Sequence, residues 1–427
     1  PNGKEFIYSF YGLARINAIS IPLNTYLTPY ELDKIFKDCS PKVIITTYAL
    51  YKKKIPPKLS KNILIILIDE LLEDGKSNIF ELKKLLAKAE TGKLPRFGAS
   101  NNQIATINYT YRGLGEPLGA VLTHGNYHHG AIGYLRLTKS ATSQRNLLIT
   151  PMSHIFTLVS CVSVPLLRGA TVVIMKTFIP SHIFKAIEEH KIDFIVAVPT
   201  IYVLLLKNYE KNRFDISSLK YGITGGSYLS ESIHQEIREK MGIELLQGYG
   251  LTETMPITCN PRSMNKPDSL GIPGHEIKVM IEDGEILVKG PTVMKGYYNR
   301  NGMNAEYFKN GWFCTGDYGH IDEDGHIYFD GLKKGIVKVG GKTVDLKEIK
   351  DVLNSFQGVE GVELDVLKDD LWGHQIYAKV RVGSKKQITE KRLRTFCKER
   401  LANYKIPRGI TIVRNLSKVY YEKTELR

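Results

Sequence analysis

Short runs of β-branched residues alternate with longer segments of helical periodicity through the first three quarters of the chain, and this alternation strongly limits the folds open to it. Each run is followed by a turn or a helical segment, so each is predicted to form a β-strand. Strands that alternate with helices favour layered α/β sheets. The predicted strands are residues 43–47, 64–69, 106–111, 147–150, 171–175 and 194–198.

The pattern changes after residue 330, where the sequence reads Gly-Leu-Lys-Lys-Gly. A chain of 427 residues is too long for one compact core, so two domains are expected. We place a large domain at 1–329, a hinge at 330–334 and a small domain at 335–427. The hinge glycines can absorb a rotation, although a plain turn is the alternative. The small domain is predicted to contain strands at 336–339, 362–367 and 375–382 and helices at 346–356 and 389–401.

The formal net charge of +15 is carried largely by lysines, as in the cluster at 52–54. No helix-turn-helix, zinc-finger or RNA-binding aromatic motif accompanies this charge, so a lysine-rich solvated surface is favoured over nucleic-acid binding. Such a surface also attracts polyanionic cofactors or an acidic carrier protein. The five scattered cysteines indicate neither disulfides nor a zinc site and favour the reducing cytoplasm. No apolar run is long enough to predict a membrane span.

Residues 247–253 read Gln-Gly-Tyr-Gly-Leu-Thr-Glu and place a hydroxyl beside a carboxylate after two glycines. Gly248 and Gly250 allow the backbone to approach a flat ring closely, and Tyr249 offers a stacking face. Thr252 and Glu253 can orient phosphate oxygens and a magnesium ion. A strand-to-loop turn is the alternative, since glycine-rich turns are common in α/β proteins.

This segment resembles the adenine and magnesium motif of the adenylate-forming superfamily, which includes acyl-CoA synthetases, insect luciferases and the adenylation domains of peptide synthetases. Other segments that resemble the superfamily follow in its order over nearly the whole chain: Pro-Met-Ser-His at 151–154, Thr-Gly-Gly-Ser at 224–227, Gly-Pro-Thr-Val-Met-Lys-Gly-Tyr-Tyr-Asn at 290–299 and Trp-Phe-Cys-Thr-Gly-Asp at 312–317. The start resembles a segment inside the superfamily's first domain, so an N-terminal portion of the usual enzyme is expected to be missing. The implied fold is a large domain of layered α/β sheets with a β-barrel-like subdomain, followed by a small mobile α+β domain.

The resemblance implies an acyl-activating ligase with two half-reactions. A carboxylate attacks the α-phosphorus of ATP to give an acyl-adenylate and pyrophosphate, and a thiol of CoA or of a carrier protein's phosphopantetheine then displaces AMP. Negative charge gathers on the phosphate oxygens, so the site needs cations and aligned donors. The resemblance assigns catalysis to Lys423, Thr252 and His154; nucleotide binding to Gly225, Gly226, Ser227, Gly248, Tyr249, Gly250, Thr252, Asp317 and Arg112; the thioester side to Lys338 and Gly341; and the magnesium ion to Glu253.

Two segments depart from the superfamily's pattern. Where a phosphate loop is usual, Tyr111, Arg112 and Leu118 stand at the positions of its serine, first glycine and lysine. Arg112 replaces the lost lysine if its side chain points inward, because a guanidinium binds phosphate bidentately. Alternatively, Tyr111 fills the phosphate space and excludes ATP. At the hinge, Leu332 replaces the usual arginine.

Three functions stay open at this point. A ligase is favoured because Glu253, Asp317 and a C-terminal lysine all persist. The alternatives are a transferase that handles acyl-AMP or acyl-thioesters without ATP activation, and a pseudoenzyme that binds a ligand and acts through a partner.

The substrate class follows from the apolar residues after His154. Ile155, Phe156 and Leu158 favour a fatty or aryl acid over an amino acid. Tyr228, His154 and Met255 are expected to line the acyl pocket, with simple core packing as the alternative.

Overall fold

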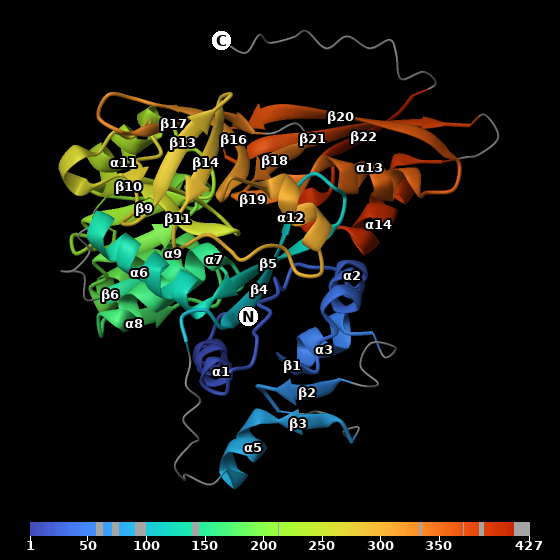
Figure 1. Cartoon of the computed structure of the whole chain (residues 1–427), viewed down its shortest axis with the longest axis horizontal. Helices are drawn as coiled ribbons and strands as arrows, with labels where there is room; N and C mark the ends of the chain where they lie inside the picture. The colour runs from blue at the N-terminus through green and yellow to red at the C-terminus, as the bar shows by residue number, and fades with distance from the viewer. Residues whose placement is uncertain are drawn as a thin grey trace.

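The structure is a computed structural model that describes residues 1–56, 63–70, 77–89, 100–138, 145–211, 213–332, 335–369, 371–383 and 388–413. Figure 1 shows a large domain, coloured blue to orange, that ends with β17, and a small orange and red domain that begins with β18 and lies along its upper edge. The expected α/β class with a large and a small domain is confirmed.

A mixed sheet of seven strands forms the centre of the large domain, in the order β12-β11-β10-β9-β8-β6-β7. Strands β7, β6, β8, β9 and β10 run parallel, and β11 and β12 are antiparallel to their neighbours. The strands are β6 (Arg145–Leu148), β7 (Thr171–Ile174), β8 (Phe194–Ala197), β9 (Tyr221–Gly225), β10 (Glu244–Leu251), β11 (Thr254–Cys259) and β12 (Ile272–Pro273).

Helices cover both faces of this sheet. Neighbouring residues of each strand point to opposite faces, and both faces carry apolar side chains that have to be buried. In β8, Ile195 packs into one hydrophobic core and Val196 into the other, and in β10 Leu245 and Leu246 divide in the same way. The helices around the sheet are α6 (His124–Thr138), α7 (Ile155–Thr157), η2 (Leu158–Ser163), α8 (Val164–Leu167), α9 (Pro180–His190), α10 (Pro199–Lys207) and α11 (Glu231–Met241).

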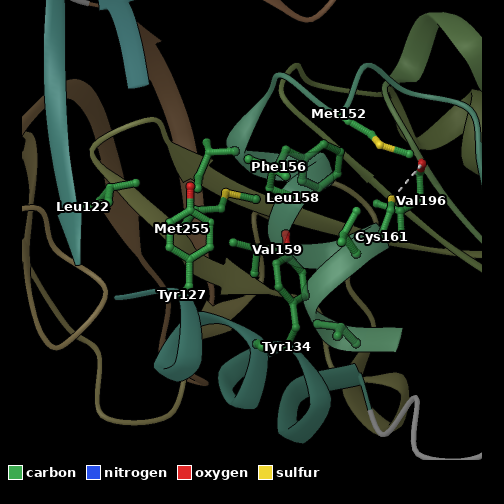
Figure 2. Packing of buried hydrophobic residues seen from close by; sticks show 14 of the residues in the cluster. Leu122, Tyr127, Tyr134, Met152, Phe156, Leu158, Val159, Cys161, Val196 and Met255 are labelled. Atoms are coloured by element: carbon green, nitrogen blue, oxygen red, sulfur yellow. Dashed lines mark hydrogen bonds between the residues drawn. The ribbon is translucent and has the colours of Figure 1, made fainter. Parts of the chain in front are cut away.

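The core between α6 and the sheet is filled by large side chains, which Figure 2 shows at close range. Tyr127 and Tyr134 come from α6, Val159 comes from η2, and Phe156 and Met255 approach from α7 and β11. All five are at most 8% exposed. This packed layer lies behind the candidate site described below.

The N-terminal quarter forms a smaller layer with a parallel three-stranded sheet, β1-β2-β3, and a separate antiparallel pair, β4-β5. Its elements are α1 (Lys4–Arg15), α2 (Pro29–Cys39), β1 (Val43–Thr46), α3 (Tyr48–Lys54), β2 (Leu64–Leu67), β3 (Ile79–Glu81), α5 (Leu82–Lys88), β4 (Ile104–Tyr111) and β5 (Pro117–Thr123). Helix α2 begins at a capping box, in which Thr28 accepts from the Glu31 backbone N–H and Glu31 accepts from the Thr28 N–H.

An antiparallel five-stranded sheet stands where a β-barrel-like subdomain was expected, in the order β13-β14-β16-β15 with β17 beside β16. It carries its own hydrophobic cluster, which includes Ile286 and Val288. The elements of this region are η3 (Arg262–Met264), β13 (Lys278–Glu282), β14 (Glu285–Lys289), α12 (Asn301–Tyr307), β15 (Phe308–Lys309), β16 (Trp312–Ile321) and β17 (Ile327–Leu332).

The small domain packs two helices on a three-stranded sheet, β20-β21-β22, and presents a hairpin, β18-β19, toward the large domain. Its elements are β18 (Ile336–Val339), β19 (Lys342–Asp345), α13 (Leu346–Asn354), β20 (Val359–Asp369), β21 (Gly373–Val382), α14 (Glu390–Arg400), η4 (Asn403–Lys405) and β22 (Gly409–Val413). Asp345 caps α13, because its carboxylate accepts from the backbone N–H groups of Lys347 and Glu348.

The elements predicted from sequence are confirmed, with ends that differ by a few residues. All six predicted strands of the large domain are present as β1, β2, β4, β6, β7 and β8, and the small-domain strands and helices are β18, β20, β21, α13 and α14. Residues 333 and 334 of the predicted hinge lie outside the described residues. Among the helices that the structure describes, none combines the length and apolar character needed to cross a bilayer.

Candidate nucleotide and acyl site

A pocket lies where the ends of β4 and β10 and the turn after β9 meet β16 and the β18-β19 hairpin. It contains about 820 Å³ of space not filled by protein atoms, part of it open to solvent. The large and the small domain therefore both contribute to its wall. Eleven of the residues predicted from sequence line it: Arg112, His154, Gly226, Gly248, Gly250, Thr252, Glu253, Met255, Asp317, Lys338 and Gly341. Tyr111, the alternative occupant of the phosphate space, lines it too.

Two glycine turns bring the domains into direct contact at the pocket. Gly226 has a φ of +82° and Gly341 a φ of +74°, both in the left-handed region that favours glycine. A Cβ on Gly226 would lie 3.3 Å from the Gly341 carbonyl oxygen, so backbone faces backbone here. The missing side chains allow the small-domain hairpin to approach the pocket closely.

Glu253 is a buried carboxylate with two neighbours that favour its negative charge, a hydroxyl donor and a guanidinium. The Tyr297 hydroxyl donates a 2.6 Å hydrogen bond to Glu253 Oε1, and the Arg112 Nε atom lies 3.6 Å from the same oxygen. Burial and the charge of Glu253 both raise the pKa of the Tyr297 hydroxyl. The carboxylate is therefore oriented by the protein before any ligand binds.

Arg112 points inward, as the compensation hypothesis requires. Its Nη1 atom donates to the Thr315 carbonyl at 2.6 Å and its Nη2 atom donates to the Cys314 carbonyl at 3.1 Å. The buried Nε atom has no hydrogen-bond partner among the described residues. Burial works against the charge, but Glu253 and weaker neighbours raise the pKa of the guanidinium. Because one N–H of each terminal nitrogen is donated to a backbone carbonyl, the guanidinium is held in place and offers the pocket a fixed positive charge.

Asp317 is held in place by Tyr249. The Tyr249 hydroxyl donates a 2.7 Å hydrogen bond to Asp317 Oδ2. Burial raises the pKa of the Asp317 carboxyl, while Lys338 and the Tyr249 hydroxyl act in the opposite direction. The Tyr249 ring itself packs in the hydrophobic cluster around Ile257 and Ile286. Tyr249 therefore contacts the site through its hydroxyl, whereas a stacking face was expected.

Lys338 and His154 both line the pocket, and the pKa of each side chain is lowered. Lys338 Nζ donates to the Thr343 hydroxyl at 2.8 Å, and burial lowers the pKa of its ammonium against the pull of Asp317 and Glu253. His154 lines the pocket and is exposed there. Desolvation, followed by the charges of Lys338 and Lys342, lowers the pKa of His154 to about 4. At neutral pH the pocket thus holds a neutral imidazole.

The other predicted site residues lie elsewhere. Gly225 and Ser227 flank the pocket without lining it, and the side chain of Tyr228, expected in the acyl pocket, is 48% exposed and does not line it either. Lys423 lies outside the described residues.

Sequence reasoning did not single out the tyrosines that support the charged groups. Tyr307 lines the pocket with its ring 5.3 Å from the Arg112 guanidinium carbon, and Tyr297 bonds to Glu253. Tyr297 lies inside the segment 290–299 that resembles the superfamily, which was the available signal. Tyr307 lies in α12, outside that segment, so no motif indicated it.

The donor set fits a magnesium ion that arrives with a nucleotide. Mg²⁺ is commonly held by one or two carboxylates together with substrate phosphates. Glu253 supplies one carboxylate and Thr252 one hydroxyl at the pocket wall. When bound, the ion would offset negative charge on the phosphates.

A second acidic group does not qualify as a metal site. Asp322, Asp324 and His326 lie close enough to share a cation. However, Lys266 Nζ already lies 2.6 Å from Asp322 Oδ2 and 2.7 Å from Asp324 Oδ2. The lysine therefore takes the place that a metal would fill.

Comparison with known proteins agrees with this geometry. A family profile described as AMP-binding enzyme matches residues 1–298. A long-chain-fatty-acid–CoA ligase of Bacillus subtilis is 28% identical over 98% of this chain and 82% of its own length, and a 2-succinylbenzoate–CoA ligase of the same organism is 30% identical over 95% and 81%.

Solved structures show the same fold. The o-succinylbenzoate CoA synthetase of Bacillus subtilis, a double mutant bound with a product analogue, has a TM-score of 0.84 at 27% identity over 98% of this chain and 84% of its own. An amide bond synthetase of Marinactinospora thermotolerans has a TM-score of 0.87 at 22% identity over 97% and 85%, which supports the fold alone. The chain belongs to the AMP-binding enzyme family, within the adenylate-forming superfamily that its motifs resemble.

Proposed function

We propose that the protein is an acid–thiol ligase that forms an acyl-adenylate from a carboxylic acid and ATP and then an acyl thioester. The observation that carries the proposal is one pocket in which two buried carboxylates, Glu253 and Asp317, face the cations Arg112 and Lys338. Ionisable groups with shifted pKa values that line a cavity mark a candidate functional site, and phosphate chemistry needs cations and aligned donors of this kind. The relatives named above are CoA ligases, which favours the same activity.

In the first half-reaction a carboxylate oxygen attacks the α-phosphorus and pyrophosphate leaves. Asp317 accepts hydrogen bonds from the ribose hydroxyls, Thr252 contacts the α-phosphate, and Glu253 would hold Mg²⁺. The glycines Gly225, Gly226, Gly248 and Gly250, with Ser227, leave room for the adenine ring. We further propose that Lys423, from the end of the chain, is the lysine that acts in this step.

Arg112 takes over part of the charge compensation of the missing phosphate-loop lysine. Its position beside Glu253, held by two carbonyls, fixes one positive charge where phosphate oxygens gather. The Tyr111 ring lies over Lys405, with Nζ 3.8 Å from the ring centroid. Tyr111 also lines the pocket, so the alternative in which it excludes ATP stays open and is decided by the binding test below.

The acyl group enters the apolar end of the pocket, formed by Ile155, Phe156 and Met255. Phe156 packs on Gly225, where a Cβ would lie 3.4 Å from its Cζ atom, and a Cβ on Gly250 would collide with Met255 Sδ. Tyr127 and Val159 pack behind this wall. The space therefore favours a short-chain or single-ring acid within the fatty and aryl class.

In the second half-reaction the thiol sulfur attacks the acyl carbonyl carbon and AMP leaves with the bonding electrons. Lys338 and Gly341 bring the small domain to the pocket for this step, and neutral His154 lines the same pocket, near the proposed place of the acyl carbonyl. The thiol belongs to CoA or to the phosphopantetheine of a carrier protein. A net charge of +15 favours either polyanionic partner.

The domain division expected from sequence completes the proposal, with a hinge at 330–334 between residues 1–329 and 335–427. Residues 331 and 332 end β17 and residue 335 precedes β18, which supports a hinge between these two strands. All five cysteines, each among the described residues, are free thiols, which fits a cytoplasmic enzyme.

A second function has a specific observation in its favour. The thioester-side residues Lys338 and Gly341 occupy the pocket, whereas the phosphate loop lacks its lysine. A transferase that accepts preformed acyl-AMP would keep this arrangement and would not need ATP activation.

ATP–pyrophosphate exchange over a panel of short, long and aryl carboxylic acids tests the ligase. Exchange that depends on an added acid is the expected result. No exchange with any acid, together with no shift of the unfolding temperature by ATP, would contradict the ligase. Thioester formation from supplied acyl-AMP by the same inactive sample would favour the transferase.

A further inference from the structure

Lys405 is a fully buried lysine that is paired with two buried carboxylates. Its Nζ atom lies 2.6 Å from Glu31 Oε1 and 2.8 Å from Glu348 Oε2. The side chains of Lys405 and Glu31 are 0% exposed, and that of Glu348 is 2% exposed. An ammonium group out of contact with water is costly unless it is paired and hydrogen-bonded. We call Glu31, Lys405 and Glu348 the buried charge cluster.

The buried charge cluster joins the two domains. Glu31 belongs to α2 of the large domain, whereas Glu348 belongs to α13 and Lys405 to η4 of the small domain. Glu31 is fixed in turn, because its Oε2 atom accepts from the backbone N–H and the hydroxyl of Thr28. The Thr28 hydroxyl also donates to the Arg400 carbonyl of the small domain at 3.2 Å. Glu31 therefore meets Lys405, its cationic partner, only when the domains are in this arrangement.

The loop after β4 connects the buried charge cluster with the pocket. The Tyr111 ring, 7% exposed, covers Lys405. Its neighbour Arg112 lines the pocket beside Glu253. Tyr111 also lines the pocket, so the end of β4 touches both sites at once.

A second connection runs from the cluster to Lys338. The Gly115 backbone N–H donates a 2.7 Å hydrogen bond to Asp345 Oδ2, and Asp345 caps the same helix that carries Glu348. Asp345 ends β19 and pairs with Ile336 of β18, and Lys338 of β18 pairs with Thr343. The hairpin that delivers Lys338 is thus attached to the large domain at its base.

We propose that Lys405 is a positioning residue for the thioester-forming step: by bridging Glu31 and Glu348 beneath Tyr111, it holds the small domain where Lys338 and Gly341 reach the pocket. The proposal rests on the proposed function. In this proposal the buried charge cluster stabilises one arrangement of the two domains. It does not contact the nucleotide or the acyl chain, which bind to other residues. Removing the bridge should therefore affect one half-reaction far more than the other.

The test measures the two half-reactions separately in the full chain, namely ATP–pyrophosphate exchange and thioester release from supplied acyl-adenylate. Glu31→Gln keeps an acceptor for the Thr28 cap but removes the charge that crosses between domains. Lys405→Met removes the ammonium at similar length. The matched control is Lys398→Met, an exposed lysine of α14 in the same small domain.

The expected result is a fall of about tenfold or more in thioester formation by Glu31→Gln and Lys405→Met, within the range of a typical coupling between sites. Exchange should change by less than about twofold, and Lys398→Met should match the wild type in both assays. If Lys405→Met does not fold, the Glu31→Gln variant alone tests the proposal. In that variant Lys405 keeps its pair with Glu348, so no buried charge is left without a partner.

Equal losses in both half-reactions, or no loss in either, by a folded Glu31→Gln protein would overturn the proposal while leaving the ligase intact. A wild-type protein that performs neither half-reaction would overturn both, and that result is visible before any variant is made.

Discussion

The Nε atom of Arg112 lies 3.6 Å from Oε1 of Glu253, with both side chains at most 8% exposed. Arg112 stands at the end of β4 and Glu253 follows β10, so the contact closes the pocket between two strands that are not neighbours in any sheet. It gives the carboxylate a partner before Mg²⁺ arrives. A cation that binds there has to share Glu253 with the guanidinium.

Glu253→Gln is expected to lower ATP–pyrophosphate exchange by at least about tenfold, or ~1.4 kcal/mol of transition-state stabilisation. The amide cannot supply the anionic ligand that Mg²⁺ prefers, and it also leaves Arg112 without its counter-charge. Raising the Mg²⁺ concentration should restore part of the loss. Glu323→Gln, an exposed glutamate, is the control, and an unchanged rate for Glu253→Gln would remove this residue from the metal site.

Arg112→Ala is expected to reduce exchange by about 10- to 100-fold, because a hydrogen bond to a charged group contributes ~1.5–3 kcal/mol. Arg112→Lys should recover only part of the rate, since an ammonium cannot bond both the Thr315 and Cys314 carbonyls as the fork does. Arg238→Ala, on the exposed end of α11, provides the comparison. Wild-type exchange by Arg112→Ala would show that the guanidinium does not replace the phosphate-loop lysine.

Met255→Ala is expected to shift acid preference toward longer chains, by about fourfold in kcat/KM for each methylene newly buried. The wild type should favour short or single-ring acids. Met241→Ala is a matched control, because both methionines are 7% exposed and Met241 packs in the other core of the sheet. A wild type that already prefers long-chain acids would contradict the proposal that the acyl-binding space is small.

His154 is expected to stay neutral down to about pH 4, where its pKa lies. A folded pKa below the unfolded value of ~6.5 means that the unfolded chain binds more protons between these limits. This group therefore makes folding less stable as the pH falls from about 6.5 to 4, and it leaves activity unaffected above that window. Comparing unfolding temperatures of the wild type and His154→Asn across pH 4–7 measures the effect.

Lys338→Met should raise the pKa of His154, because the lysine is the largest charge acting on it after desolvation. An NMR titration of the histidine signals reads this directly. An unmoved His154 pKa would mean that Lys338 does not reach the imidazole.

Much of the fold and part of the site were predictable from sequence. Short runs of β-branched residues located the strands because strand propensity is a local property, and short motifs located Glu253 and Asp317 because the spacing within each motif is local too. Lys405 shows where such reasoning ends. Its partner Glu31 lies 374 residues away in the chain, and nothing in the sequence around a lysine distinguishes a fully buried one from a solvated one.

Tyr249 shows a second limit. A tyrosine between two glycines predicts a ring that a nucleotide can stack on, but the direction of the ring depends on which side of β10 the five-stranded sheet covers. That packing is tertiary, and it turns the hydroxyl toward Asp317 while burying the face.

Tyr111 and Arg112 occupy consecutive positions at the end of β4, and this adjacency limits how the segment can evolve. A single-residue deletion upstream in β4 would shift both residues, moving the guanidinium away from Glu253 and the aromatic ring away from Lys405. Both contacts would be lost in one event, so a change of length in β4 should be tolerated less well than a point substitution at either position.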